Sequence, residues 1–184
     1  MIYTHAVGID PSTKTGIVVL DKDGRDIFRK EIQLERGIKS TAKEMKEYGR
    51  EIVSFVPPGS VVSIEGFSYG SQGQGVSTQY GVGYAIRYEL LSAGLSFWEP
   101  TPSQVKKFAT GKGNTTKDNM TIPILRLWNF EHPSDNVRDA YVLAQIARGL
   151  SGAADIHDGD YYSYQLEVLQ AMKNPPVEKK KKTR

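Results

Sequence analysis

Three acidic residues far apart in the chain, Asp10, Glu65 and Asp139, have the types and positions best suited to chemistry. Asp10 and Glu65 each end an apolar run that predicts a buried strand, and Asp139 opens an apolar helical run. Carboxylates gathered in one cleft repel one another unless cations hold them. Such hard oxygen ligands select Mg²⁺ or Mn²⁺, and two such ions about 4 Å apart promote phosphodiester hydrolysis. If the fold brings these acids together, the sequence predicts a metal-dependent hydrolase.

Each of the three acids also has an ordinary structural explanation. Asp10 precedes a proline and a serine, a context in which an aspartate often bonds to nearby backbone and starts a turn. In the structural explanation, Glu65 only caps the turn that follows its strand, although an acid at the end of a buried strand is unusual. Asp139 would be a solvated helix residue, although its apolar neighbours place it near the core. The spacing alone leaves these alternatives open.

The elements that must position these acids follow from the patterns of apolar residues and turn residues. Five strands are expected, over residues 6–10, 16–20, 25–34, 60–64 and 95–99. Helices are expected over residues 38–56, 76–94, 104–108, 116–128, 137–150 and 161–173. Two glycines inside the second of these helices, Gly81 and Gly83, predict the close approach of another backbone or of a ligand. The order of elements predicts an α/β fold with a mixed sheet.

The composition is typical of one soluble domain of 184 residues. The absence of cysteine excludes disulfides and thiolate metal sites and is compatible with a cytoplasmic location, which we expect. No run approaches the ~20 apolar residues that a membrane span needs, so no membrane partner is expected. We expect one domain over residues 1–173 and a disordered tail over residues 174–184, because that tail is too charged to fold alone.

Basic residues gather at two places that suit a polyanionic partner, although any single lysine is more simply a solvated surface residue. Lys106, Lys112 and Lys117 lie in and around a Gly/Lys loop whose amides and ammonium groups suit phosphates. That loop lacks the residue order of a P-loop, which argues against nucleotide binding of that type. Four lysines and an arginine lie within residues 179–184. This distribution is compatible with a polyanionic partner.

Taken in order, the motifs resemble the RuvC family of Holliday-junction resolvases. The matching pieces are Gly8-Ile9-Asp10-Pro11-Ser12 with Thr15-Gly16, then Ile64-Glu65, then Gln104-Val105-Lys106 before the Gly/Lys loop, and finally Asp139-Ala140. They span roughly residues 4–150, and their order makes the match specific although each piece alone is weak. The basic tail and the unusual loop look like the divergent family members that phages carry.

The resemblance implies a ribonuclease-H-like fold, with a mixed five-stranded sheet flanked by helices, and a homodimer. It implies paired nicks in branched DNA, in four-way and also three-way junctions, that leave 5′-phosphates. Asp10, Glu65 and Asp139 carry over as ligands of two Mg²⁺ ions per site, with Mn²⁺ as a substitute. Lys106 and Lys117 match basic residues beside the family's site. Phe67 and Tyr69 straddle the position of the aromatic residue that family members push against junction bases.

One position departs from the family pattern. The family places an Asp or a His three residues before the last catalytic Asp, whereas this chain has Asn136 there and an acid one residue earlier, Asp135. Residues four apart share a helix face, so Asp135 joins Asp139 if the helix has begun at Asp135 and Ser134 is the cap. If Asp135 is itself the cap, its carboxylate bonds to first-turn amides and Asn136 becomes the alternative ligand. We expect Asp135 to be the fourth catalytic acid and metal ligand.

Two other functions fit parts of the pattern. A non-catalytic protein that binds branched DNA would explain Asn136 as the mark of a decayed site, but the retention of the other three acids argues against decay. The segment around Asp10 also suits the phosphate-binding hairpin of actin-like phosphotransferases. Those proteins carry a second such hairpin and are usually much longer, and this chain has neither feature.

Overall fold

The computed structural model describes residues 3–68, 73, 75–152 and 161–175. Its centre is a five-stranded sheet with the strand order β3-β2-β1-β4-β5. β1 (His5–Asp10), β2 (Lys14–Asp21) and β3 (Asp26–Gln33) run antiparallel, whereas β4 (Val61–Ile64) lies parallel to β1 and β5 (Phe97–Trp98) lies parallel to β4. The mixed sheet expected from the sequence is therefore confirmed.

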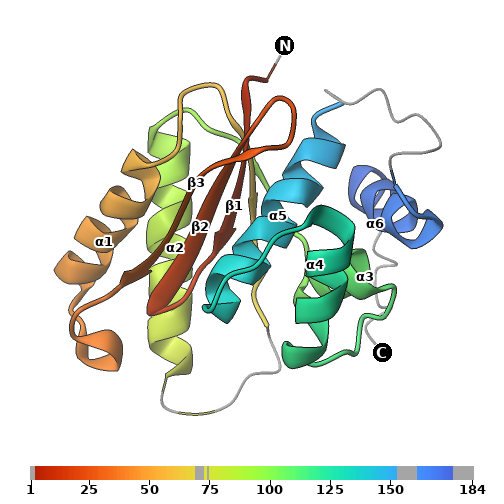
Figure 1. Cartoon of the computed structure of the whole chain (residues 1–184). Coiled ribbons are helices and arrows are strands. Elements are labelled where there is room, and N and C mark those ends of the chain that lie inside the picture. Colours follow the sequence, from red (N-terminus) through yellow and green to blue (C-terminus); the bar gives the residue numbers. More distant parts are fainter. Residues whose placement is uncertain (1–2, 69–72, 74, 153–160, 176–184) are drawn as a thin grey trace, which may run out of the picture.

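Helices cover both faces of this sheet, as Figure 1 shows. α1 and α2 pack side by side on one face, and α5 lies across the other face with α3, α4 and α6 beyond it. The bounds are α1 Ala42–Ser54, α2 Val76–Ser92, α3 Pro102–Thr110, α4 Thr121–Trp128, α5 Asp135–Leu150 and α6 Ser163–Lys173, with 3-10 turns at Gly37–Lys39 and Asp118–Met120. Within the described residues, no helix combines the length and the apolar character that a membrane span requires.

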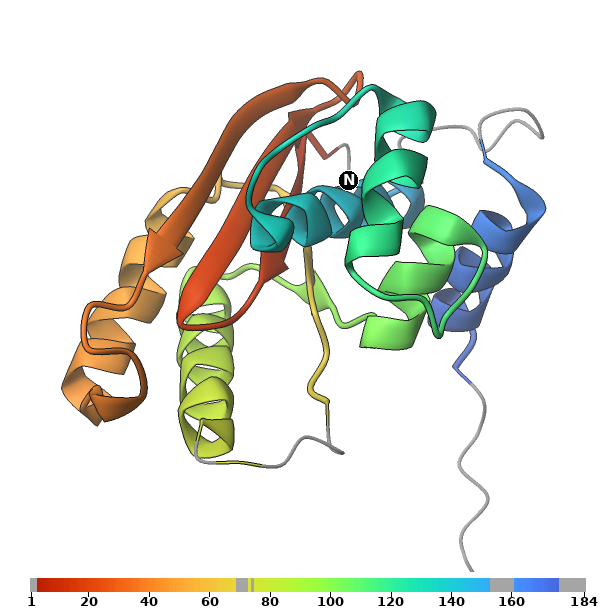
Figure 2. The same cartoon turned by 60° about the horizontal axis from the view of Figure 1, so that its bottom comes forward.

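Alternation along the central strands explains the two apolar layers. In β1, Val7 and Ile9 pack towards α1 and α2, whereas Ala6 packs towards α5, because successive side chains of a strand point to opposite faces. Figure 2, in which the lower edge of the sheet comes forward, shows the sheet between these two layers. Both layers are mainly apolar, although Ser63 of β4 and Gln145 of α5 are also buried.

Two glycines let α5 lie directly on the sheet. A Cβ atom at Gly8 would collide with the backbone of α5 at Ala140, and one at Gly16 would collide with its backbone at Asn136. Interiors tolerate no such overlap, so only glycine permits this approach. The glycines in the opening strands therefore set how deeply the first half of α5 sits against the end of β1.

Some predicted boundaries differ from the structure for local reasons. The first helix begins at Ala42 rather than residue 38, because Thr41 and Glu44 form a reciprocal capping box. The fifth strand keeps only two paired residues. Gly81 and Gly83 do make room for close neighbours, but these are side chains, the Met45 sulfur and the Phe67 ring, so the prediction of an approaching backbone there is wrong.

Two predictions fall partly outside the described residues. Tyr69 is not among them, and of the predicted tail only residues 174 and 175 are. The division of the chain into one domain over residues 1–173 and a disordered tail stays a prediction.

Candidate active site

Asp10 and Glu65 lie side by side at one edge of the sheet. Asp10 is the last residue of β1, and Glu65 directly follows β4. The Glu65 N–H donates to the Ile9 carbonyl at 3.0 Å, which extends the parallel pairing of the two strands by one step. The carboxyl ends of neighbouring parallel strands meet at the same edge, so the two acids face the same space. The strand pattern thus brings together two of the acids that the sequence singled out.

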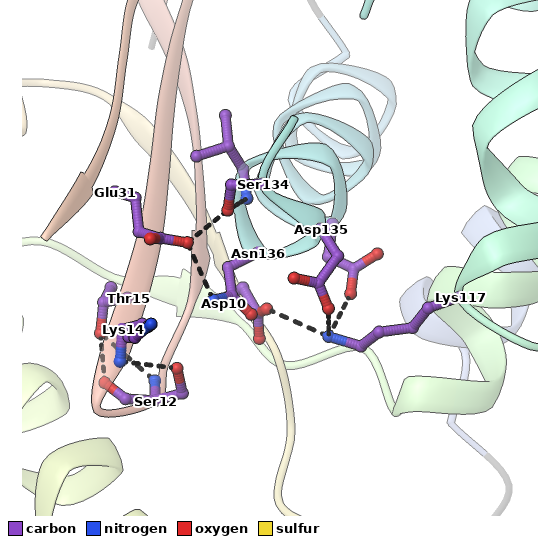
Figure 3. Close-up of polar contacts among 11 residues, drawn as sticks. Asp10, Ser12, Lys14, Thr15, Glu31, Lys117, Ser134, Asp135 and Asn136 are labelled. Atoms are coloured by element: carbon purple, nitrogen blue, oxygen red, sulfur yellow. Dashed lines mark hydrogen bonds and ion pairs between the residues drawn. The ribbon is translucent and has the colours of Figure 1, made fainter. Parts of the chain in front are cut away.

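The turn after Asp10 is fixed by its own hydrogen bonds. Pro11 ends the strand, and the Thr15 hydroxyl donates to the Ser12 carbonyl at 2.8 Å while accepting from the Ser12 N–H at 3.2 Å. The Tyr48 hydroxyl from α1 accepts from the Thr15 N–H at 3.0 Å. Figure 3 shows this turn beside Asp10. A tightly bonded turn holds the end of β1 in place and, with it, the Asp10 side chain.

Helix α5 supplies the other two acids. The Ser134 hydroxyl accepts from the Val137 N–H, so Ser134 is the N-cap and the helix has begun at Asp135. Asp135 therefore lies one helical turn before Asp139, and the two share a face. The Lys117 Nζ atom lies 3.1 Å from an Asp135 oxygen, 2.9 Å from an Asp139 oxygen and 3.9 Å from an Asp10 oxygen. One ammonium group thus joins three of the four acids, and Figure 3 labels two of them, Asp10 and Asp135.

Asn136 is engaged elsewhere. Its side-chain amide donates to a Glu31 oxygen on β3 at 3.1 Å, and the Ser134 hydroxyl donates to the same oxygen. Figure 3 shows Glu31 on the side of the helix opposite to Lys117. Of the two residues that the sequence left as alternatives, Asp135 contacts the Lys117 cluster and Asn136 contacts Glu31. Glu31 itself was missed, because an exposed acid in a polar strand carries no local signal.

The acids carry more negative charge than their surroundings balance. Burial, followed by the charges of Glu65 and Asp139, raises the pKa of Asp10 well above its usual value. Burial, followed by the charge of Asp139, raises the pKa of Glu65 to about 7. Burial likewise raises the pKa of Asp139, although Lys117 opposes this. The cluster would be stabilised by further positive charge.

The pKa values of Lys117 and Asp135 are both shifted in the direction that keeps the side chain charged. Burial lowers the pKa of Lys117, but the charges of Asp10 and Asp139 outweigh it and hold that pKa above its usual range. Burial works to raise the pKa of the more exposed Asp135, but the hydrogen bond to Lys117, the charge of Lys117 and hydrogen bonds from backbone amides together outweigh burial and lower that pKa. Lys117 is therefore a fully charged counterion inside the acidic cluster.

The structure locates three of the four other sequence-predicted residues. Lys106 on α3 is close enough that its charge opposes the rise in the Glu65 pKa. A narrow groove beside Glu65 is lined by Phe67, among other residues. Lys112 is exposed in the loop after α3. Tyr69 lies outside the described residues.

Comparison with known proteins places this geometry in a family. The crossover junction endodeoxyribonuclease RuvC of Aliarcobacter butzleri (strain RM4018) is 31% identical over 148 residues, which cover 75% of this chain and 94% of that protein. The chain belongs to the RuvC family. No family model matches it. The resemblance inferred from the sequence motifs is therefore confirmed at the level of the family.

Solved RuvC structures share the fold. Thermus thermophilus RuvC superposes with a TM-score of 0.59 at 19% identity, over 80% of this chain and 93% of that one. T. thermophilus RuvC in complex with a Holliday junction substrate superposes with a TM-score of 0.60 at 16% identity, over 86% of this chain and 98% of that one. At such identities the likeness concerns the fold alone, and it confirms the expected ribonuclease-H-like architecture.

The donor set of this RuvC-family chain suits a hard divalent cation. Four carboxylates from β1, the end of β4 and α5 converge, and burial together with the negative charge of neighbouring carboxylates raises the pKa values of three of them. Among the described residues, however, no three acidic or histidine side chains are arranged to hold a metal ion. The ammonium of Lys117 stands among the carboxylates instead. The residues fit a metal ion on condition that this ammonium moves.

The charge imbalance predicts how the metal-free protein responds to pH. The folded-state pKa of Glu65, about 7, lies above its value in the unfolded chain, so the folded state binds more protons. The free energy of unfolding should therefore fall as pH rises from about 5 to about 8.

Replacing Asp10 with asparagine should raise the melting temperature at pH 8, by about 2–4 °C per kcal/mol of repulsion removed. Calorimetry in EDTA measures both effects, with the exposed Asp23→Asn as control; a lower melting temperature for Asp10→Asn would contradict this.

Proposed function

We propose that this protein is a metal-dependent endonuclease that resolves Holliday junctions and related branched DNA by paired nicks that leave 5′-phosphates. The observation that carries the proposal is the convergence of Asp10, Asp135 and Asp139 on one cation, beside Glu65, in a chain of the RuvC family. We place the enzyme in the cytoplasm of a bacterium or of a phage-infected cell. Its origin in a phage stays a prediction.

Asp10, Glu65, Asp135 and Asp139 are proposed to hold two Mg²⁺ ions, for which Mn²⁺ can substitute. When bound, such ions supply Lewis acidity to phosphate oxygens and lower the pKa of water. Metal and the Lys117 ammonium compete for the same carboxylate oxygens, so Lys117 leaves the cluster when the metal site fills. The Lys117 side chain is 46% exposed and can turn towards the DNA backbone. Lys106 stays beside Glu65 and adds positive charge where a phosphate must approach.

The DNA is proposed to lie over the acids and along the groove at Glu65. Phe67 lines this groove together with Tyr80, and the two rings lie 5.0 Å apart. Aromatic rings at such a place suit the unstacked bases of a branch point. We propose that Phe67 contacts DNA, and the same role for Tyr69 stays a prediction. Another depression, between the end of β3 and α1, is lined by several glutamates and has the wrong charge for DNA.

Lysines near the acids should contribute affinity without sequence preference. Replacing Lys112 with alanine should weaken junction binding in EDTA and lower the slope of log affinity against log salt by about one. Lys106→Ala should behave in the same way. The matched control is Lys43→Ala, because Lys43 is an exposed lysine of α1 that pairs with Glu47. A salt slope unchanged from wild type in the Lys112 variant would remove Lys112 from the interface.

We further propose a homodimer formed through α2. Three large apolar side chains of this helix are exposed, Tyr84 at 46%, Tyr88 at 64% and Leu91 at 59%, and a shallow groove lies between α1 and α2 beside them. Exposed apolar patches of this kind mark interaction sites. A two-fold symmetric dimer would present two acidic clusters to the two symmetric strands of a junction, as paired nicking requires.

A charge placed on this helix should separate the protomers. The double variant Tyr88→Glu/Leu91→Glu should be monomeric by light scattering at a concentration where the wild type is dimeric, because each glutamate would be buried without a partner. Ile27→Glu on β3 is the control, since Ile27 is equally exposed but lies on another face. If the wild type is monomeric and still makes paired nicks, the dimer proposal is wrong.

The activity is tested with a 5′-labelled four-way junction, incubated with Mg²⁺ or with EDTA. The expected result is a pair of symmetric nicks in Mg²⁺, none in EDTA, and products that DNA ligase can seal. Tight binding without nicks under any metal condition would favour the non-catalytic alternative. ATP hydrolysis without nicks would favour an actin-like phosphotransferase.

A further inference from the structure

Arg87 is a buried cation next to the acidic cluster to which no role has been given so far. It lies on α2, and only 5% of its surface is exposed. Its Nε atom donates to a Glu99 oxygen at 2.7 Å, one terminal nitrogen donates to the Gly83 carbonyl at 2.9 Å, and the other donates to the Glu65 carbonyl at 2.8 Å. All three nitrogens of the guanidinium group are therefore bonded, and one of the bonds reaches the backbone of a proposed metal ligand.

The Glu65 backbone is held from three directions. Its N–H donates to Ile9 of β1, the next N–H, that of Gly66, donates to the Pro100 carbonyl at 2.8 Å, and its carbonyl accepts from Arg87. Glu65 lies just beyond the last residue of β4, so regular strand pairing does not hold its carbonyl. Arg87 supplies the bond that the sheet does not.

The same arginine reaches the segment that follows. Its guanidinium group lies 4.2 Å from the centre of the Phe67 ring, within the range of a cation–π contact. A Cβ atom at Gly83 would lie 2.5 Å from this ring and 3.1 Å from the guanidinium, so glycine at that position makes room for the stack. Arg87 therefore contacts both the proposed metal ligand and the proposed DNA-contacting aromatic residue.

We propose that Arg87 is a positioning residue, which fixes the Glu65 peptide so that the Glu65 carboxylate faces Asp10 and Asp139. The inference rests on the proposed function, because it takes Glu65 to be a metal ligand. A held peptide fixes the direction of the Cα–Cβ bond, and a few tenths of an ångström there decide whether a carboxylate reaches a shared cation. Lysine cannot replace Arg87 fully, because an ammonium group cannot span three separate acceptors in a plane.

The test measures metal binding rather than cleavage. Arg87→Met keeps the length of the side chain but removes the three bonds, and Arg87→Lys keeps only the charge. Mg²⁺ is titrated against each purified protein without DNA, and the half-saturating concentration is read from the rise in melting temperature. We expect the half-saturating Mg²⁺ concentration to increase about tenfold for Arg87→Met, as it does when other groups that orient metal ligands are removed. For Arg87→Lys we expect a smaller increase.

The matched control is Arg50→Met. Arg50 also bridges α1 and α2, through Glu89 at 3.7 Å, but its side chain is exposed and does not touch the Glu65 segment. Its half-saturating Mg²⁺ concentration should equal that of the wild type. A lower melting temperature without metal, with unchanged half-saturation, for Arg87→Met would show a purely structural role and overturn the proposal. If Arg87→Met does not fold, unchanged half-saturation in Arg87→Lys overturns it instead.

A double variant separates this proposal from the function on which it rests. Arg87 acts only through Glu65, so Glu65→Gln/Arg87→Met should need the same Mg²⁺ concentration as Glu65→Gln alone. If the two effects multiply, Arg87 acts by another route and the proposal is wrong. If Glu65→Gln by itself changes neither metal binding nor cleavage, the ligand assignment under the proposed function is what fails.

Discussion

Replacing Asp139 with asparagine should abolish cleavage of a four-way junction while leaving junction binding intact. The change keeps the size of the side chain but removes a charge that the proposed metal ions need, and the loss of several kcal/mol of transition-state stabilisation corresponds to a factor of roughly a thousand or more. Asp10→Asn and Glu65→Gln should behave alike. Junction affinity in EDTA should stay the same or increase, because each variant reduces repulsion between the acids and phosphate.

The comparison requires a control of the same chemistry nearby. Asp118→Asn serves, since Asp118 is an exposed acid in the 3-10 turn next to Lys117. Its cleavage rate should match that of the wild type. Full activity in Asp10→Asn, Glu65→Gln or Asp139→Asn would show that the assigned acids are not the catalytic ones.

The second large effect is expected at the position where this chain departs from its family. Asp135 shares Lys117 with Asp139, whereas the Asn136 amide is bonded to Glu31. Asp135→Asn should therefore raise the Mg²⁺ concentration needed for half-maximal cleavage by about tenfold or more. Asn136→Ala should raise it by less than about threefold, because it only loosens the first turn of α5.

A Mg²⁺ titration of the two variants, with junction cleavage as the readout, decides whether Asp135 or Asn136 is the metal ligand. Asn136→Ala with a much greater metal requirement than Asp135→Asn would make Asn136 the ligand and the proposed fourth acid wrong. Glu31→Gln is informative in the same experiment. It keeps an acceptor for the Ser134 hydroxyl and the Asn136 amide, so a metal requirement near that of the wild type is expected.

Local sequence patterns were sufficient to predict the framework. The opening hairpin, the third strand and the short strand before Glu65 follow from alternation and turn residues, which act over a few positions. The sequence placed the start of α5 at residue 137 and left Ser134 and Asp135 open as its cap, whereas the helix begins at Asp135 with Ser134 as the cap. The strand at the side of the sheet, β5, was less predictable, since only two of its residues pair with the neighbouring strand β4.

The contacts that link distant segments could not be predicted in this way. Glu31 and Asn136 are separated by 105 positions and Arg87 and Glu65 by 22, and nothing in the local sequence marks either pair. Lys117 was named from the clustering of lysines and from the resemblance to the RuvC family, but its place among three carboxylates depends on how α5 packs against β1. Such contacts are set by tertiary packing, which the spacing of residues along the sequence does not reveal.

The central claim, that the acids at the ends of β1 and β4 and on α5 hold the metal of a nuclease, is tested most directly by anomalous diffraction from crystals containing Mn²⁺. We predict anomalous peaks at about 2.0–2.3 Å from carboxylate oxygens of Asp10, Glu65 and Asp139, with the Lys117 ammonium displaced from them. Crystals with Mn²⁺ bound elsewhere, and with Lys117 still between Asp135 and Asp139, would contradict it.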